Sequence, residues 1–247
     1  MEPFQIQIAG ITFLVHPMYE TTRVYCQKYL SDNSAKYEIF VTADDLAREQ
    51  ELAEIEAVEE GLKIRKFTDP FLERAVIQRK IANILLEHDT VLLHGSTVGM
   101  NGAAYLFTAA CGTGKSTHTR LWREVFGDRA VMINDDKPFL QILADGVIAH
   151  GSPWSGKHGL DTNISVPLKG ICVLHRGLEN RIFPASSDAL RKMLRHQCLI
   201  PDDPALAART ATLVEKLMDC VPLWEMDCNK SPDAARISYG VMSGTVL

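Results

Sequence analysis

The sequence lacks the features that would mark a membrane or exported protein. Its 247 residues contain no apolar run that approaches the roughly 18 to 20 residues needed to span a bilayer. The opening Met1-Glu2-Pro3-Phe4 has neither the basic nor the apolar segment of a signal peptide. We therefore expect a cytoplasmic protein with no membrane partner.

Excess positive charge, regularly spaced cysteines and internal repeats are absent as well. The net charge is −5 at pH 7, with no dense cluster of lysine and arginine, so we expect no nucleic-acid partner. The six cysteines show no C-x-x-C spacing, which predicts reduced and mostly packed thiols. No repeat or low-complexity tract marks a sharp domain boundary.

Hydrophobic residues make up 46% of the chain, enough for one good core and a small accessory unit. Residues 1–66 predict a small α+β subdomain, which either recognises an acceptor or covers one edge of the core sheet. Residues 67–247 are expected to form the core. It should begin with a helix capped by Asp69-Pro70 and end in further helices.

A glycine-containing loop is the most informative part of the core. It follows the apolar run 103–107 and precedes a helical pattern over 117–126. Gly112 and Gly114 allow backbone N–H groups to face phosphate oxygens, Lys115 supplies a charge for the β and γ phosphates, and Ser116 offers a hydroxyl to Mg²⁺. The candidate nucleotide-binding residues are Cys111, Gly112, Thr113, Gly114, Lys115, Ser116 and Thr117.

This loop departs from G-x-x-x-x-G-K-[ST] at its first position, where Ala109 replaces glycine. Alanine is tolerated there only at negative φ. The alternative interpretation is a strand-to-helix turn followed by a surface lysine.

An acidic pair, Asp135-Asp136, follows the apolar run 130–133, which predicts a buried parallel strand. Its carboxylates are then expected at the edge of the sheet where α/β proteins bind ligands, one holding Mg²⁺ and the other accepting a proton. The segment 134–138 is also typical of a solvated turn, and this alternative stays open.

Several segments together resemble the catalytic domain of HPr kinase/phosphorylase. They are the run 91–96, the glycine turn near 101–102, the phosphate loop and the acidic pair, with His94 placed 21 residues before Lys115. The loop and the acidic pair also resemble ATP-dependent phosphoenolpyruvate carboxykinase, of the same superfamily. The fold implied is an α/β, P-loop nucleotide-binding core of the phosphoenolpyruvate carboxykinase/HPr kinase type.

The resemblance implies phosphoryl transfer from ATP, or alternatively pyrophosphate, to a serine or another hydroxyl. Asp136 then corresponds to the general base and Asp135 assists the metal, while His94 lies near the transferred phosphate. A purely structural histidine, hydrogen-bonded beneath the loop, is the alternative for His94.

After the acidic pair, the stretch 151–160 departs from the Arg-Gly-Leu-Gly signature of HPr kinase/phosphorylase. It more closely resembles HPr-kinase-like proteins found beside peptide-modification genes. Its glycines favour a mobile substrate loop, in which Trp154 offers a flat surface and Lys157 neutralises developing phosphate charge. The alternative is an ordinary connection with Trp154 packed in the core.

Taken together, the sequence predicts an ATP- and Mg²⁺-dependent phosphotransferase whose acceptor is a peptide, protein or small-molecule hydroxyl. A nucleotide-binding regulator or maturation partner with little turnover is the alternative function. The oligomeric state stays open, with a homo-oligomer among the options.

Overall fold

The computed structural model describes residues 1–59, 61, 63–110, 112–185 and 188–245. Contacts divide the chain into two compact units, Met1–Ile84 and Leu85–Leu247, called here the N-terminal and C-terminal units. No helix in the described ranges is both long and apolar enough to cross a membrane.

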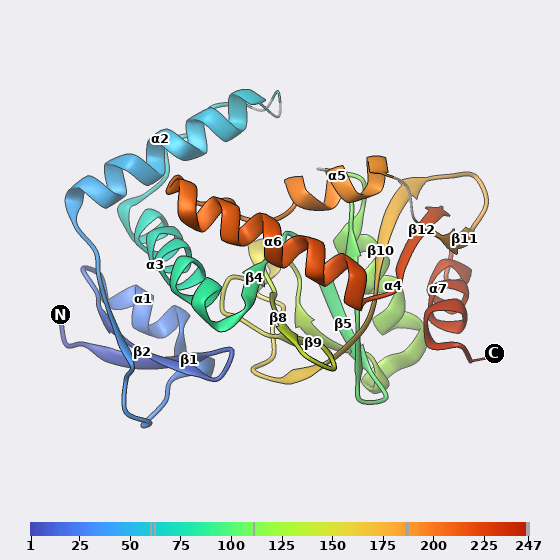
Figure 1. The fold of residues 1–247 in the computed structure, drawn as a ribbon, viewed down its shortest axis with the longest axis horizontal. Coiled ribbons are helices and arrows are strands. Elements are labelled where there is room, and N and C mark those ends of the chain that lie inside the picture. The colour runs from blue at the N-terminus through green and yellow to red at the C-terminus, as the bar shows by residue number, and fades with distance from the viewer. Residues whose placement is uncertain (60, 62, 111, 186–187, 246–247) are drawn as a thin grey trace. The chain divides into compact units, whose positions relative to one another are not determined.

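The N-terminal unit, blue to blue-green in Figure 1, combines a small sheet with three α-helices. Strand β2 lies in the middle, antiparallel to β1 and parallel to β3. Its elements are β1 (Phe4–Ile8), β2 (Ile11–His16), α1 (Glu20–Tyr25), β3 (Tyr37–Phe40), α2 (Ala43–Glu59) and α3 (Asp69–Leu85), with a 3₁₀ turn at Gln27–Tyr29. The predicted small α+β arrangement is therefore present.

Helix α3 belongs by its contacts to this N-terminal unit. The sequence placed the boundary near residue 66 and assigned this helix to the core. Buried Leu72 and Val76 of α3 pack with Leu46 of α2, and buried Glu73 accepts hydrogen bonds from Met18 and Thr22. The apolar and polar faces of α3 thus both find partners earlier in the chain, and the division falls after Ile84.

The C-terminal unit is built on a nine-stranded mixed sheet with the order β4-β8-β9-β10-β6-β5-β7, in which β12 also pairs with β10 and β11 pairs with β12. Its strands are β4 (Thr90–Leu92), β5 (Ser96–Met100), β6 (Ala103–Thr108), β7 (Val131–Asn134), β8 (Phe139–Leu143), β9 (Gly146–His150), β10 (Ser165–Arg176), β11 (Arg181–Pro184) and β12 (Leu223–Cys228). Its helices are α4 (Lys115–Phe126), α5 (Asp188–His196), α6 (Pro204–Cys220) and α7 (Asp233–Ser243), with short 3₁₀ turns at Leu86–His88, Gly127–Arg129 and Gly156–His158.

Helices cover both faces of this sheet (Figure 1). Because successive side chains of a strand point to opposite faces, Ala104 and Leu106 of β6 enter one core and Tyr105 and Phe107 enter the other. The first core includes buried leucines of α5 and α6. The second includes Leu121 and Trp122 of α4 and small residues of α7.

Strand direction differs in part from the sequence-based expectation. Strand β10 pairs in parallel with β6 and β12, but β5 lies antiparallel between β6 and β7. The predicted strand that precedes the acidic pair, β7, therefore has an antiparallel neighbour. An apolar run shows that a strand is buried but not which strand lies beside it.

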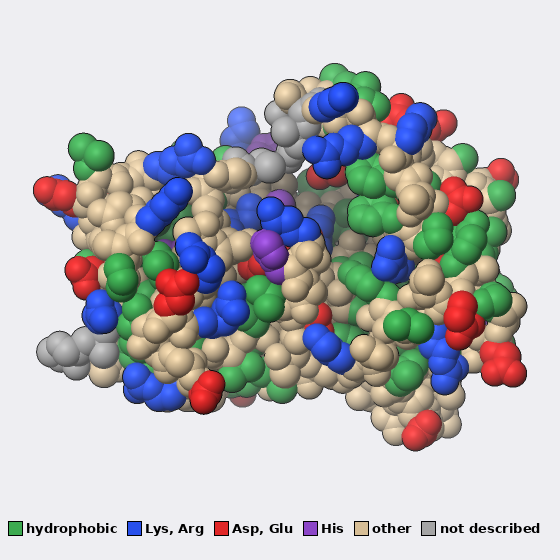
Figure 2. Space-filling model, turned by 180° about the vertical axis from the view of Figure 1, so that it is seen from behind, with side chains coloured by type: hydrophobic (Ala, Val, Ile, Leu, Met, Phe, Trp, Pro, Cys, Tyr) green, Lys and Arg blue, Asp and Glu red, His purple; other side chains and the backbone are tan. Residues whose placement is uncertain are grey.

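Charged side chains of both signs are interspersed with hydrophobic ones on the face shown in Figure 2. The five described cysteines are free, and Cys26, Cys172 and Cys198 are buried. Burial raises the pKa of Cys26 and of Cys198 to about 12, so these thiols are protonated packing groups.

Candidate functional site

The phosphate loop connects β6 to the N-terminus of α4. Gly114 is the N-cap of α4 with φ of 128°, a value that excludes most side chains, and no side chain caps the helix. The first turn also carries no acidic residue. The start of α4 therefore has the features of an anion-binding helix N-terminus.

Lys115 is the first residue of α4, and its Nζ donates to the carbonyl of Ala109 at 3.2 Å. Ala109 is not among the residues with positive φ, as its place in the loop requires. Ser116 and Thr117 follow in the first turn and are half-buried. Cys111, also expected to contact nucleotide, lies outside the described residues.

A buried polar cluster anchors α4 to α7. Trp122 Nε1 donates to Ser238 Oγ of α7 at 2.9 Å, and His118 Nε2 lies 3.0 Å from the same oxygen. Burial lowers the pKa of His118 to about 3, so this imidazole is neutral. The helix that presents Lys115 is thereby anchored on its inner face.

The acidic pair follows β7 in a turn closed by the buried Asn134. Its Oδ1 accepts the backbone N–H groups of Asp136 at 2.8 Å and Lys137 at 2.6 Å. The predicted turn chemistry is therefore present, but the turn is not simply solvated: Asn134 is fully buried and Asp135 is 6% exposed. The turn interpretation and the acidic site coexist at the same residues.

Asp136 and His94 face one another. His94 Nε2 lies 3.1 Å from Asp136 Oδ1, and each side chain is about one-third exposed. Burial by itself raises the pKa of Asp136, but the hydrogen bond from His94 and the charges of Lys137, His94 and Lys115 outweigh it and hold the pKa below its usual value. The carboxylate is thus ionised and lies within the field of the loop lysine.

The main chain of His94 is fixed independently of this contact. Its N–H donates to the carbonyl of Gln197 at 2.7 Å, and its carbonyl accepts the hydroxyl of Thr108 at 2.8 Å. Gly95 N donates in turn to the carbonyl of Asp136 at 3.0 Å. Backbone bonding thus positions His94, while its ring is directed to the acidic turn.

Asp135 has a different environment. Its Oδ1 accepts the hydroxyl of Ser96 at 2.6 Å, and no other side chain in the described ranges donates to it. A carboxylate buried with one neutral donor is costly in the absence of positive charge. Mg²⁺ commonly binds one or two carboxylates and completes its shell with water and substrate phosphates.

Asp135 supplies a buried carboxylate and Ser116 a half-buried hydroxyl, which are the kinds of oxygen donor that a nucleotide-associated Mg²⁺ uses. The described residues contain no cluster of three or more His, Cys, Asp and Glu side chains suited to a metal. A cation held by the protein alone is thus not the chemistry that this donor set favours.

The segment after β9 is packed against the acidic turn. Asn134 Nδ2 donates to Ser152 O at 2.9 Å and to Trp154 O at 3.3 Å, and Trp154 is 6% exposed, with its ring near Phe139. The interpretation of Trp154 as a packed core residue is therefore the one that the structure supports. The structure does not support a mobile substrate loop that offers Trp154 as a surface.

Lys157 lies in the exposed part of this segment, in the 3₁₀ turn Gly156–His158. Gly156 has φ of 69°, and a Cβ built on it would approach Asp136 Cβ to 3.2 Å. Glycine is thus needed where the turn passes the acidic pair. The structure brings Gly156, the neighbour of Lys157, next to Asp136, while Lys157 itself is exposed.

Two polar residues of this region, Ser96 and Asn134, escaped the sequence-based prediction, and Arg176 was expected more readily as a surface charge after a strand than as a phosphate contact. Arg176 ends β10 and donates through Nη2 to the carbonyl of Gly112 at 2.7 Å, which ties the phosphate loop to the neighbouring strand. The signal available in the sequence was a lone polar residue within or directly after an apolar run. The sequence alone does not indicate which residue such a side chain contacts.

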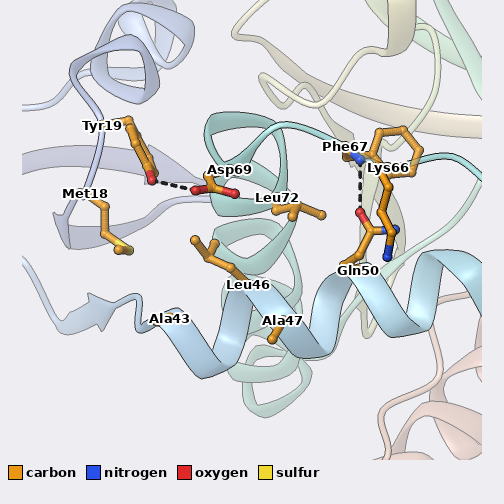
Figure 3. A pocket seen from close by; sticks show the side chains of 10 residues that line it. All are labelled: Met18, Tyr19, Ala43, Leu46, Ala47, Gln50, Lys66, Phe67, Asp69 and Leu72. Atoms are coloured by element: carbon orange, nitrogen blue, oxygen red, sulfur yellow. Dashed lines mark hydrogen bonds between the residues drawn. The ribbon is translucent and has the colours of Figure 1, made fainter.

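A pocket of about 410 Å³ lies in the N-terminal unit, between α2, the start of α3 and the segment around Tyr19 (Figure 3). Its walls include Leu46 and Leu72. The polar groups around it bond to one another: Tyr19 donates to Asp69 at 3.0 Å, and Gln50 accepts from Phe67 N at 2.9 Å. This pocket is a concave and partly apolar surface, and none of the predicted site residues lines it.

No family model matches the chain, and no curated protein matches it at a significant level. Among solved structures, the HPr(Ser) kinase/phosphatase from Coxiella burnetii is similar to it, with 13% identity and a TM-score of 0.35. The match covers 62% of this chain and 93% of that protein. What the site can do chemically follows from its own geometry.

Proposed function

We propose that the C-terminal unit is an ATP- and Mg²⁺-dependent kinase of the HPr kinase type, which transfers a phosphoryl group to a hydroxyl, such as a serine of a peptide or protein. The observation that carries the proposal is the meeting of Lys115, Asp136 and His94. The charges of Lys115 and His94 both lower the pKa of Asp136, and His94 contacts it at 3.1 Å.

This arrangement supports a division of tasks among the chain's own residues. The N–H groups of the first turn of α4 and the Lys115 ammonium bind and orient the phosphates of the donor. Ser116 and Asp135 would hold Mg²⁺, which when bound neutralises charge on the β and γ phosphates. Orientation and charge stabilisation supply most of the catalysis in phosphoryl transfer.

In this proposal Asp136 accepts the proton of the acceptor hydroxyl. As that proton passes to a carboxylate oxygen, the hydroxyl oxygen forms a bond to the γ phosphorus and the bond to the ADP oxygen breaks. His94 orients the Asp136 carboxylate through Oδ1. The lowered pKa keeps Asp136 ionised and ready to accept a proton at neutral pH.

The test is to incubate the protein with γ-labelled ATP, Mg²⁺ and candidate acceptors. Label transferred to an acceptor supports a kinase, whereas release of free phosphate supports a slow nucleotide hydrolase. Nucleotide binding without either reaction supports the alternative of a regulator or maturation partner. No nucleotide binding at all would contradict both assignments.

Lys115→Ala is the decisive variant. Loss of this charge should lower transfer by about 10²- to 10³-fold, as removal of one preorganised charge-stabilising group does elsewhere. Lys216→Ala is the matched control, because Lys216 is an exposed lysine of α6. Unchanged transfer by a folded Lys115→Ala protein would exclude the phosphate-loop assignment.

A further inference from the structure

A chain of buried hydroxyl groups connects the acidic turn to the helix that carries the phosphate loop. Ser96 Oγ lies 2.6 Å from Asp135 Oδ1 and 2.7 Å from Thr119 Oγ1. All three residues are at most 6% exposed. They come from β5, from the end of β7 and from the second turn of α4, so this short chain joins three elements of the site.

The direction of these hydrogen bonds follows from the number of protons. Ser96 donates its single hydroxyl proton to Asp135 Oδ1. Thr119 must then donate its own proton to Ser96 Oγ, since otherwise two oxygen lone pairs would face one another at 2.7 Å. The contacts of Thr119 Oγ1 with the carbonyls of Ser116 and Lys115, at 3.4 and 3.5 Å, are longer and secondary.

One oxygen of Asp135 is thus fixed from the protein side. Oδ1 is engaged by Ser96, and among the described side chains none donates to Oδ2. Residues that orient a metal-binding carboxylate in this way typically contribute strongly to metal affinity although they never touch the ion.

We propose that Ser96 is a positioning residue for Asp135: its hydroxyl, oriented by Thr119, holds Oδ1 so that Oδ2 binds the divalent cation that accompanies the nucleotide. This inference rests on the proposed function, because it assumes a nucleotide-associated cation at Asp135. The inference assigns a role to a residue that does not contact the substrate. It also links the cation site to α4 through Thr119.

The experiment measures cation binding rather than turnover. Mn²⁺ is titrated into the protein together with a non-hydrolysable ATP analogue, and free Mn²⁺ is followed by electron paramagnetic resonance. Ser96→Ala should weaken Mn²⁺ binding by about 10- to 100-fold, the usual effect of removing a residue that orients a metal ligand. Thr119→Val should cause a smaller loss in the same direction, because Ser96 keeps its contact with Asp135.

Thr97→Val is the matched control. Thr97 is the next residue of β5, is equally buried and has a hydroxyl without a hydrogen-bond partner. Because its side chain points to the opposite face of the sheet, this variant should bind Mn²⁺ like the wild type. If Ser96→Ala lacks a cooperative thermal transition, Ser96→Cys replaces it, since a thiol fills the site but donates weakly.

Each outcome decides a separate point. Wild-type protein that binds neither the analogue nor Mn²⁺ would overturn both the proposed function and this inference. Wild-type protein that binds Mn²⁺ with the analogue, alongside a folded Ser96 variant of equal Mn²⁺ affinity, would overturn the positioning role alone. An equal loss in Thr97→Val would show a general effect of β5 packing and would also refute it.

Discussion

Replacing Asn134 by alanine should destabilise the C-terminal unit by about 3 to 4 kcal/mol, at about 1 kcal/mol for each hydrogen bond lost. The side chain accepts the backbone N–H groups of Asp136 and Lys137, and donates to Ser152 O, Ser152 Oγ and Trp154 O. The amide group has two N–H protons for these three acceptors. Together with the two accepted bonds, the substitution therefore removes about four full hydrogen bonds. Asn134 is fully buried, which leaves little water to replace them.

Asn134→Asp separates the two halves of this network. The carboxylate still accepts from Asp136 and Lys137, but an oxygen replaces Nδ2 and faces the carbonyls of Ser152 and Trp154. Because this places like partial charges together in a buried site, we expect a loss at least as large as that of alanine. Ser155→Ala is a graded control that removes a single hydroxyl, whose contact with Asp161 is 2.8 Å and whose longer contact with Pro153 O is 3.4 Å, and it should cost about 1 kcal/mol.

Urea unfolding followed by tryptophan fluorescence is the assay, with equal m-values required for the comparison. The three tryptophans, Trp122, Trp154 and Trp224, all lie in the C-terminal unit, so the signal reports on that unit. A loss below about 1 kcal/mol for Asn134→Ala would show that the network contributes no more than one ordinary hydrogen bond. An aspartate variant as stable as the wild type would refute the assigned donor role of Nδ2.

The remaining predictions concern the site itself. Asp136→Asn should lower kcat far more than ATP affinity in steady-state kinetics, because an amide fills the position but accepts no proton; equal effects on both would argue against a base. Because folding lowers the pKa of Asp136, its carboxylate stabilises the native state at pH values above the ordinary aspartate pKa. This advantage over Asp136→Asn should disappear as the pH falls through the lowered pKa. The urea midpoints of the two proteins across a pH series measure it. Arg176→Ala should weaken nucleotide binding in calorimetry, because the contact with Gly112 O that holds the loop is lost, whereas Arg236→Ala on α7 should not. Lys157→Ala should reduce transfer to the acceptor more than ATP binding, and wild-type transfer would leave this exposed lysine without a catalytic task.

The sequence predicted the elements with strong periodicity and the residues of a spaced motif. A helical pattern over 117–126 predicted a helix after the glycine-containing loop, and α4 lies at Lys115–Phe126. Lys115 and the acidic pair were predicted as site residues because glycine, lysine and aspartate stand in an order that suits a strand, a loop and a helix. Each of these signals is local in the chain.

The supporting residues could not be found in the same way. Ser96 and Asp135 are 39 residues apart, and Ser96 and Thr119 are 23 apart, so only the pairing of β5 with β6 and β7 brings them together. A serine in an apolar strand has many possible partners until the sheet order is known. Sheet order is a property of the whole unit, and a local pattern of residues does not specify the antiparallel place of β5 between β6 and β7.

The two neighbouring aspartates lie in one turn but in different environments. Asp135 is 6% exposed and bonded to one neutral hydroxyl, which favours a carboxylate completed by a metal ion. Asp136 is about one-third exposed and lies among positive groups, which favours a carboxylate that meets the acceptor and takes its proton. Asn134 enforces the difference, since its bonds to the turn fix the backbone from which both side chains project. Different environments are the usual means of giving adjacent carboxyl groups separate tasks, and they are the physical basis on which we propose the metal for Asp135 and the proton for Asp136.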